Sequence, residues 1–124
     1  MINRALERIF ELVSVDPRRI EVGGFSDGAS YALGLGLANG DLFSKIIAFS
    51  PGFVPSGPRV GEPGIYVSHG DADAVLPINR TSRRLVPALR AEGFDVCYRE
   101  FKGLHTVPAH IAQEAFQWLG GRQS

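Results

Sequence analysis

Apolar residues near the amino terminus recur at helical spacing, with charged residues between them. The positions that carry this pattern are Ile2, Leu6, Ile9, Phe10 and Val13. Such spacing places the apolar side chains on one face and predicts an amphipathic helix. The helix is expected to end at Asp16, because the following Pro17 disfavours helical backbone in the residue before it.

Shorter apolar runs bounded by turn residues predict β-strands farther along the chain. Strands are expected over residues 19–23, 46–49, 65–68 and 96–101. Helices are expected over residues 30–38, 79–91 and 108–119. The Gly- and Pro-rich segment 51–63 is predicted to be a loop, and Pro87 is predicted to kink the helix in which it lies.

Segment 30–38 has features of both kinds of structure. Leu33, Leu35 and Leu37 alternate with small residues, as they would in a strand. The segment nevertheless lies between a predicted strand and the helix stop signal Asn39-Gly40, which favours a helix. Its glycines would let that helix approach a sheet closely.

The predicted elements alternate between strands and helices over a chain of 124 residues. Short apolar strands separated by helices are typical of a parallel sheet that is covered on both faces. We therefore predict the α/β class, with a mostly parallel sheet of about four strands flanked by helices. The chain is expected to form a single domain over residues 1–124.

The composition is that of a soluble globular protein, with 44% hydrophobic and 21% charged residues. Basic and acidic residues balance at 13 each, so the charge does not favour nucleic acid or an anionic membrane as a partner. No apolar run is long enough to span a bilayer, and the amino terminus does not resemble a signal peptide. Because Cys97 is the single cysteine, we expect a reducing, cytoplasmic location without an internal disulfide.

The pentapeptide Gly24-Phe25-Ser26-Asp27-Gly28 has the pattern G-x-S-x-G and lies between a predicted strand and a predicted helix. A sharp turn there would hold the Ser26 hydroxyl at the carboxyl end of the sheet. The backbone N–H of Asp27 would lie beside it and can donate to an oxyanion. We therefore predict Ser26 as a nucleophile, although a Gly-rich turn with an incidental serine has the same letters.

A serine hydroxyl becomes an effective nucleophile only when a base accepts its proton. His105 is the candidate base, because it lies in a predicted loop between the last strand and the last helix. Asp73 and Asp71, after the preceding strand, are the candidates for the acid that orients this base. Of the other two histidines, His69 is expected mainly to shape a turn, and His110 to be a surface or packing residue.

On these residues the sequence resembles the phospholipase/carboxylesterase branch of the α/β-hydrolases, which includes small carboxylesterases and acyl-thioesterases. The resemblance covers almost the whole chain and rests on segments 24–30, 48–52, 68–77 and 103–105. Ser26, Asp73 and His105 follow the family's order of nucleophile, acid and base. The family's pattern H-G-x-x-D-x-x-x-P implies Asp73 rather than Asp71 as the acid. Asp27 stands where many relatives have Gln.

The resemblance further implies that the chain corresponds to only the second half of the family's domain. Family members have several strands before the strand of the nucleophile, and the loop after the third supplies a second oxyanion donor. The strand from Arg19 to Gly23 would then be a bare sheet edge, which invites pairing with another chain. Either the sequence is therefore a partial one, or this edge pairs with another chain. Our hypothesis is association through the edge, in a homo-oligomer or with a partner chain.

The sequence thus predicts a serine hydrolase that cleaves small-molecule carboxylic esters with short or medium acyl chains through an acyl-enzyme. No cofactor and no metal are expected, because no cluster of His, Cys and Asp has ligand spacing. An acyl-thioesterase and a lysophospholipase-like enzyme are variants within this class, and a catalytically inactive remnant or a binding module is the alternative. The apolar acyl pocket is predicted to contain Phe25, Phe53, Val75, Leu76 and Leu104.

Overall fold

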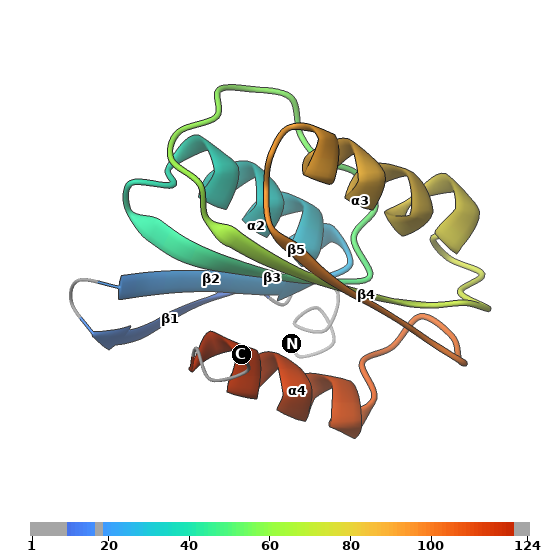
Figure 1. The fold of residues 1–124 in the computed structure, drawn as a ribbon. Coiled ribbons are helices and arrows are strands. Elements are labelled where there is room, and N and C mark those ends of the chain that lie inside the picture. Colours follow the sequence, from blue (N-terminus) through green and yellow to red (C-terminus); the bar gives the residue numbers. More distant parts are fainter. Residues whose placement is uncertain (1–9, 17–18, 121–124) are drawn as a thin grey trace.

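The strands form one sheet whose two faces are covered by helices (Figure 1). The computed structural model describes residues 10–16 and 19–120. The elements in chain order are β1 (Phe10–Asp16), β2 (Arg19–Phe25), α2 (Asp27–Ala38), β3 (Phe43–Phe49), β4 (Gly64–Gly70), the 3₁₀ helix η1 (Ile78–Arg80), α3 (Ser82–Ala91), β5 (Val96–Phe101) and α4 (Ala109–Leu119). The strand order in the sheet is β1-β2-β3-β4-β5.

Strands β2 to β5 pair in parallel, whereas β1 pairs antiparallel with β2. The predicted α/β class, with four parallel strands flanked by helices, is confirmed. Strand β5 has the predicted bounds, and the other three parallel strands contain the predicted runs. Because parallel strands end at the same edge of a sheet, the loops after β2, β4 and β5 all open on one side of the molecule.

The predicted amino-terminal helix is wrong for its last residues. Phe10 and Val13 lie in β1, which pairs with β2 as far as Asp16. The other apolar positions of the pattern, Ile2, Leu6 and Ile9, lie outside the described residues. The helical spacing of the apolar residues does not determine the conformation of this segment. As a strand, the segment pairs with backbone donors and acceptors of β2 that would have no partner if it were a helix.

The strand from Arg19 to Gly23 is not a bare edge, contrary to the expectation from the sequence. On one side of β2, Val22 lies opposite Leu12 of β1, and on the other side it lies opposite Ile46 of β3. The backbone of β2 is therefore paired on both sides, which removes the basis for association through this strand. The outer strands of the described sheet are β1 and β5.

Figure 1 shows α2 and α3 on one face of the sheet and α4 on the other. The core on the α2/α3 face contains Val22, Ala29, Ala32, Leu33, Leu37, Phe43, Ile46, Ala48, Ile65, Val67, Leu85, Val86, Leu89, Phe94 and Val96. The smaller core beneath α4 contains Ile47, Tyr66, Phe101, Ile111, Ala115 and Leu119. Neighbours such as Ile46 and Ile47 belong to different cores, because successive side chains of a strand point to opposite faces.

The helical interpretation of segment 30–38 is correct, and the helix begins earlier, at Asp27. Its glycines bring it close to the sheet: a Cβ added to Gly36 would lie 2.5 Å from Ile46 Cδ1. Helix α2 has 12 residues. Within residues 10–16 and 19–120, no helix is both long and apolar enough to cross a membrane.

The predicted helix over residues 79–91 is divided, but not at the proline. The 3₁₀ helix η1 ends at Arg80 and α3 begins at Ser82, with Thr81 between them at φ −122° and ψ −101°. Pro87 lies inside α3, which continues to Ala91. The interruption at Thr81 allows the chain to turn from the loop after β4 into the helix.

Candidate active site

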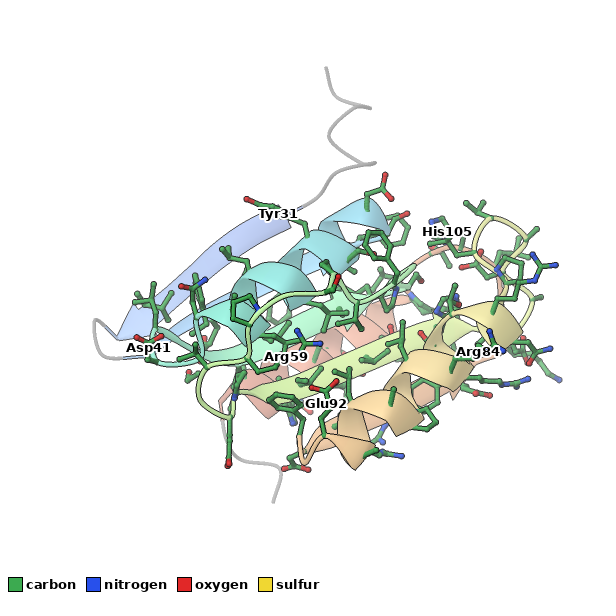
Figure 2. The ribbon with its side chains drawn as sticks, turned by 90° about the horizontal axis from the view of Figure 1, so that it is seen from above. Tyr31, Asp41, Arg59, Arg84, Glu92 and His105 are labelled. Atoms are coloured by element: carbon green, nitrogen blue, oxygen red, sulfur yellow. The ribbon has the colours of Figure 1, made fainter. Side chains whose placement is uncertain are left out.

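Ser26, Asp73 and His105 meet at the carboxyl edge of the sheet, each from a different loop. The His105 Nε2 atom lies 2.9 Å from Ser26 Oγ, and His105 Nδ1 lies 2.6 Å from Asp73 Oδ2. Figure 2 shows His105 at the end of the sheet opposite to Asp41, which precedes β3. The fold thus brings into hydrogen-bond contact side chains that are as far as 79 positions apart in the sequence.

Ser26 occupies a turn with an uncommon backbone conformation. Its φ is 60° and its ψ is −118°, a region that residues with a side chain seldom adopt. A Cβ added to Gly24 would lie 2.3 Å from the carbonyl atoms of Gly28, so this turn requires glycine at position 24. The pentapeptide therefore forms a sharp strand-to-helix turn that raises the Ser26 side chain at the end of β2.

Helix α2 begins directly after Ser26, with Asp27 as its first residue. The first amides of a helix have no acceptor within that helix, so the Asp27 N–H lies at the positive end of α2. The Ser26 N–H donates to the Phe49 carbonyl of β3 at 2.9 Å and fixes the turn against the sheet. The local structure thus places a backbone donor beside the Ser26 hydroxyl.

The two aspartates of the loop after β4 have different partners. Asp73 is only 4% exposed, and its Oδ1 accepts hydrogen bonds from two amides of its own turn at 2.9 and 2.7 Å. Its Oδ2 accepts from His105. Asp71 is exposed, and its Oδ1 accepts a hydrogen bond from Gly103 N at 3.2 Å. Asp71 therefore steadies the loop that precedes His105, while Asp73 contacts the imidazole itself.

The loop that carries His105 packs tightly against the end of β4. A Cβ added to Gly70 would lie 2.2 Å from the Leu104 carbonyl oxygen and 2.5 Å from that of Gly103. The Ala72 N–H also donates to the Gly103 carbonyl at 2.8 Å. Only glycine at position 70 allows the loop to pass so close, and this contact helps to place His105 over the edge of the sheet.

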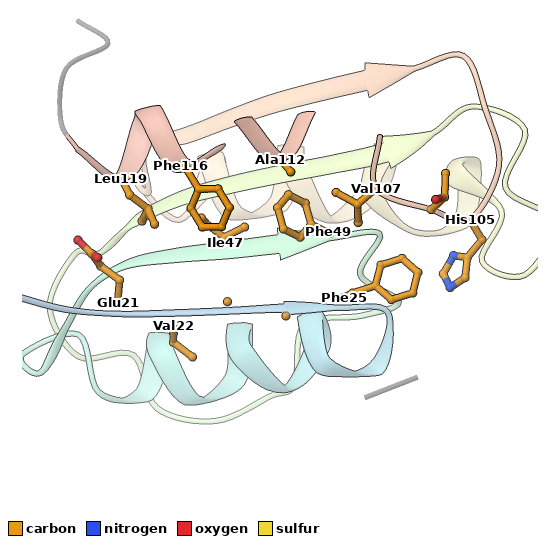
Figure 3. A pocket seen from close by; sticks show the side chains of 13 residues that line it. Glu21, Val22, Phe25, Ile47, Phe49, His105, Val107, Ala112, Phe116 and Leu119 are labelled. Atoms are coloured by element: carbon orange, nitrogen blue, oxygen red, sulfur yellow. The ribbon is translucent and has the colours of Figure 1, made fainter. Parts of the chain in front are cut away.

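An apolar cavity of about 510 Å³ begins beside His105 and continues between the sheet and α4 (Figure 3). The centroid of the Phe25 ring lies 4.8 Å from that of the His105 ring. The cavity is lined by Glu21, Val22, Gly23, Gly24, Phe25, Ile47, Phe49, His105, Thr106, Val107, Ala112, Phe116 and Leu119. The site thus adjoins an apolar volume on the α4 face of the sheet.

Of the five residues predicted to form an apolar pocket, Phe25 alone lines this cavity. Phe53, Val75 and Leu104 are largely exposed, at 58%, 64% and 62%, and Leu76 is half-buried. These four lie on the loops after β3, β4 and β5, around the same edge of the sheet as Ser26. The sequence did not indicate the cavity-lining residues of β3 and α4, because their apolar pattern is that of ordinary core.

His69 is not mainly the turn-shaping residue that the sequence suggested. It is fully buried, and its ring nitrogens contact Ser82 Oγ at 2.6 Å and the Leu76 carbonyl oxygen at 2.7 Å. Burial lowers the pKa of His69 below its usual value. The strand alternation contained a signal for this, because His69 has the same parity as Ile65 and Val67, which point into the core.

Other titratable groups have contacts or surroundings of their own. Two hydrogen bonds from Arg83 to Glu100, at 2.8 Å each, join α3 to β5 and lower the pKa of Glu100 to about 2. His110 is exposed on α4. Burial raises the pKa of the Cys97 thiol on β5. In the part of the chain that the structure describes, no group of three or more His, Cys, Asp or Glu is placed to hold a metal ion.

Comparison with known proteins is consistent with this architecture. The sequence model of the family described as Phospholipase/Carboxylesterase matches residues 1–119. The crystal structure of esterase PE8 has a TM-score of 0.72 and 30% identity, over 80% of this chain and 48% of that protein. A comparison with curated protein sequences finds no match.

Two further solved structures have similar folds. Acyl-protein thioesterase 2 from Zea mays has a TM-score of 0.65 and 23% identity, over 80% of this chain and 54% of that protein. A thermostable esterase has a TM-score of 0.65 and 26% identity, over 86% of this chain and 32% of that protein. The chain therefore spans about half of the length of the first two proteins and a third of the other.

Proposed function

The chain belongs to the phospholipase/carboxylesterase family, and on that premise we propose that it is a serine hydrolase of carboxylic esters. The observation that carries the proposal is the hydrogen-bonded series from Ser26 Oγ through His105 to Asp73. Each side chain in this series has the chemistry that acyl transfer requires: a hydroxyl nucleophile, an imidazole base and a carboxylate that orients the base.

In the proposed reaction, Ser26 Oγ attacks the ester carbonyl carbon while its proton passes to His105 Nε2. The oxyanion that forms accepts a hydrogen bond from the Asp27 N–H at the start of α2. His105 then gives the proton to the departing alkoxide, which leaves as an alcohol, and an acyl-enzyme remains. Water attacks the acyl carbonyl carbon as His105 takes its proton. His105 then returns this proton to Ser26 Oγ as the bond to the acyl group breaks, so that Ser26 is regenerated and the carboxylic acid is released.

Asp73 has the role of orienting group in this proposal. Its carboxylate stabilises the imidazolium that forms in each half-reaction and holds Nδ1 protonated, so that Nε2 faces Ser26. The Nδ1–Oδ2 distance of 2.6 Å and the burial of the carboxylate support this assignment. Asp71 contacts the loop before His105 instead of the ring, which supports Asp73 over Asp71.

We assign small-molecule esters with short or medium acyl chains as the substrate class. Phe25 lies beside His105, and the exposed side chains of Phe53, Val75 and Leu104 supply apolar surface on loops at the edge of the sheet that carries Ser26. Leu76 adds to this surface from the turn that holds Asp73. Thioesters contain the same carbonyl electrophile, so a comparison of matched oxygen and sulfur esters would separate esterase from thioesterase activity.

The test is covalent labelling of the purified chain with a fluorophosphonate probe, together with hydrolysis of p-nitrophenyl butyrate. We expect labelling of the wild type and of Ser56→Ala, which changes an exposed loop serine, and none of Ser26→Ala. The His105→Gln variant should lose at least about 10³-fold in rate, because the nucleophile then has no base.

A wild-type chain that is folded by circular dichroism, yet takes no label and cleaves no ester, would contradict the proposal. That result would favour a catalytically inactive binding module. Labelling that persists in Ser26→Ala would instead place the reactive serine elsewhere in the chain.

A further inference from the structure

Behind Asp73 lies a buried pair of polar side chains that the proposed reaction does not use. His69 is on β4 and Ser82 is the first residue of α3, and both are 0% exposed. His69 Nδ1 lies 2.6 Å from Ser82 Oγ. His69 Nε2 lies 2.7 Å from the Leu76 carbonyl oxygen and 3.3 Å from Asp73 Oδ2. The pair therefore connects α3 to the carboxylate that contacts His105.

The partners of the His69 ring determine which nitrogen carries the proton. The Leu76 carbonyl oxygen can only accept a hydrogen bond, so Nε2 must be the donor. Burial lowers the pKa of His69. The hydrogen bond to the Leu76 carbonyl and the nearby Asp73 and Glu100 carboxylates oppose this effect, while His105 acts in the same direction as burial. The ring is therefore neutral at neutral pH, Nδ1 is an acceptor, and the Ser82 hydroxyl donates to it.

The Leu76 peptide group extends this connection to the second oxygen of Asp73. Its carbonyl accepts from His69, and its N–H donates to Asp73 Oδ1 at 2.7 Å. His69 thus acts on the carboxylate through the Leu76 peptide that holds Oδ1, while its Nε2 atom also lies 3.3 Å from Oδ2. A carboxylate held at both oxygens has little freedom to rotate away from His105.

We propose that His69, held in one orientation by Ser82, is a positioning residue that aligns the Asp73 carboxylate with His105. The effect of this alignment on rate rests on the serine hydrolase function proposed above. The alignment itself is a property of the folded protein and can be observed without any turnover.

The first test is the proton NMR spectrum of the folded protein, where a short Nδ1–H···Oδ2 bond between His105 and Asp73 produces a signal at low field. We expect this signal in the wild type and in His69→Gln, whose amide N–H can replace Nε2–H. It should be lost or broadened by exchange in His69→Leu, which has no donor. Nitrogen chemical shifts of the His69 ring should show the Nε2–H tautomer in the wild type.

The second test is steady-state hydrolysis of p-nitrophenyl butyrate by the same variants. We expect His69→Leu to lower kcat by about 10- to 100-fold with little change in KM, the range expected when a buried carbonyl loses its hydrogen-bond donor and the peptide that holds Asp73 is released. His69→Gln should recover most of this loss. Ser82→Ala should lower kcat by about 3- to 10-fold, since it removes the partner of Nδ1 but retains Nε2–H.

His110→Gln and Ser56→Ala, at exposed positions, are the matched controls and should leave both readouts unchanged. If His69→Leu does not fold, Ser82→Ala and His69→Gln still test the inference. A wild-type His69 on the Nδ1–H tautomer, or an unchanged low-field signal and kcat in Ser82→Ala and His69→Leu, would overturn it. A different result is that the low-field signal changes among the variants as expected, but the wild type takes no fluorophosphonate. This result would retain the positioning role of His69 and refute only the proposed hydrolase function.

Discussion

The two faces of the sheet differ in how completely the helices bury the strands. On the α2/α3 face the core side chains Leu33 and Ile46 are 0% exposed, and the helices approach the strands closely. On the other face α4 leaves an apolar cavity of about 510 Å³ along β2 and β3, with Phe116 at its wall 61% exposed (Figure 3). One face is thus closely packed (the closed face), and the other has an apolar cavity beside the site (the open face).

The difference explains how the proposed site is held. His69 points to the closed face, where its buried ring contacts Ser82 and lies behind Asp73. Phe25 lies on the open side of the site, where its ring contacts that of His105 and lines the cavity. We infer that the closed face supplies rigidity to Asp73 and His105, whereas the open face supplies apolar space beside them.

Truncation of a core side chain should separate the two faces most strongly. Leu33→Ala on α2 should lower the free energy of unfolding by about 2–5 kcal/mol, because the surrounding core cannot collapse into the space. Phe116→Ala on α4 should change it by less than about 0.5 kcal/mol, since most of that ring already contacts solvent. Urea denaturation followed by circular dichroism measures both. A cost for Phe116→Ala as large as that for Leu33→Ala would show that the cavity is filled in solution.

Adding a methyl group to the closed face should also destabilise the protein. In Gly36→Ala the new Cβ would lie 2.5 Å from Ile46 Cγ1 and Cδ1, and Ile46 is 0% exposed. The overpacking should lower the free energy of unfolding by about 1–3 kcal/mol, less the gain in helix propensity of alanine over glycine. The denaturant midpoint should fall accordingly. An unchanged midpoint would mean that α2 can move away from β3 without cost.

The buried imidazole on the closed face should make stability depend on pH. The pKa of His69 is lower in the folded protein than in the unfolded chain, so the unfolded chain binds the extra proton first as the pH falls. Stability from this group is therefore complete above the unfolded pKa of about 6.5 and decreases as the pH falls below it. The His69→Gln variant should lack this part of the pH dependence. Equal slopes in urea titrations of the two proteins would contradict a neutral buried imidazole.

The smallest effect is expected for a methyl group added to the open face. In Gly23→Ala the new Cβ would lie 3.4 Å from Ile47 Cβ, with no closer heavy atom. This distance is the shortest that an ordinary van der Waals contact of a Cβ atom has, and alanine is less costly than glycine in a strand. The free energy of unfolding should therefore change by less than about 0.5 kcal/mol. Differential scanning calorimetry of Gly23→Ala beside Gly36→Ala would show the contrast directly. A large decrease in the stability of Gly23→Ala would show that other atoms occupy the cavity next to Gly23.

Much of the secondary structure could be predicted from short segments of the sequence. Strand β5 has the bounds that its apolar run predicts, and the pattern around Ser26 identifies the turn after β2, because a positive φ beside two glycines is a local requirement. The order of Ser26, Asp73 and His105 along alternating strands and helices placed all three at one edge of a parallel sheet. Local backbone chemistry and strand polarity are properties that a sequence carries in itself.

Other features required the assembled fold. Phe10 and Val13 fit helical spacing, yet they lie in β1 because β2 offers a strand to pair with. The role of His69 depends on Ser82, which is 13 positions away in the sequence and meets it only when α3 packs on β4. Sequence by itself determined which polar side chains the loops at this edge of the sheet carry. Which segments cover that sheet, and which polar groups meet behind the edge, was decided by tertiary packing, because pairing and burial depend on residues distant in the chain.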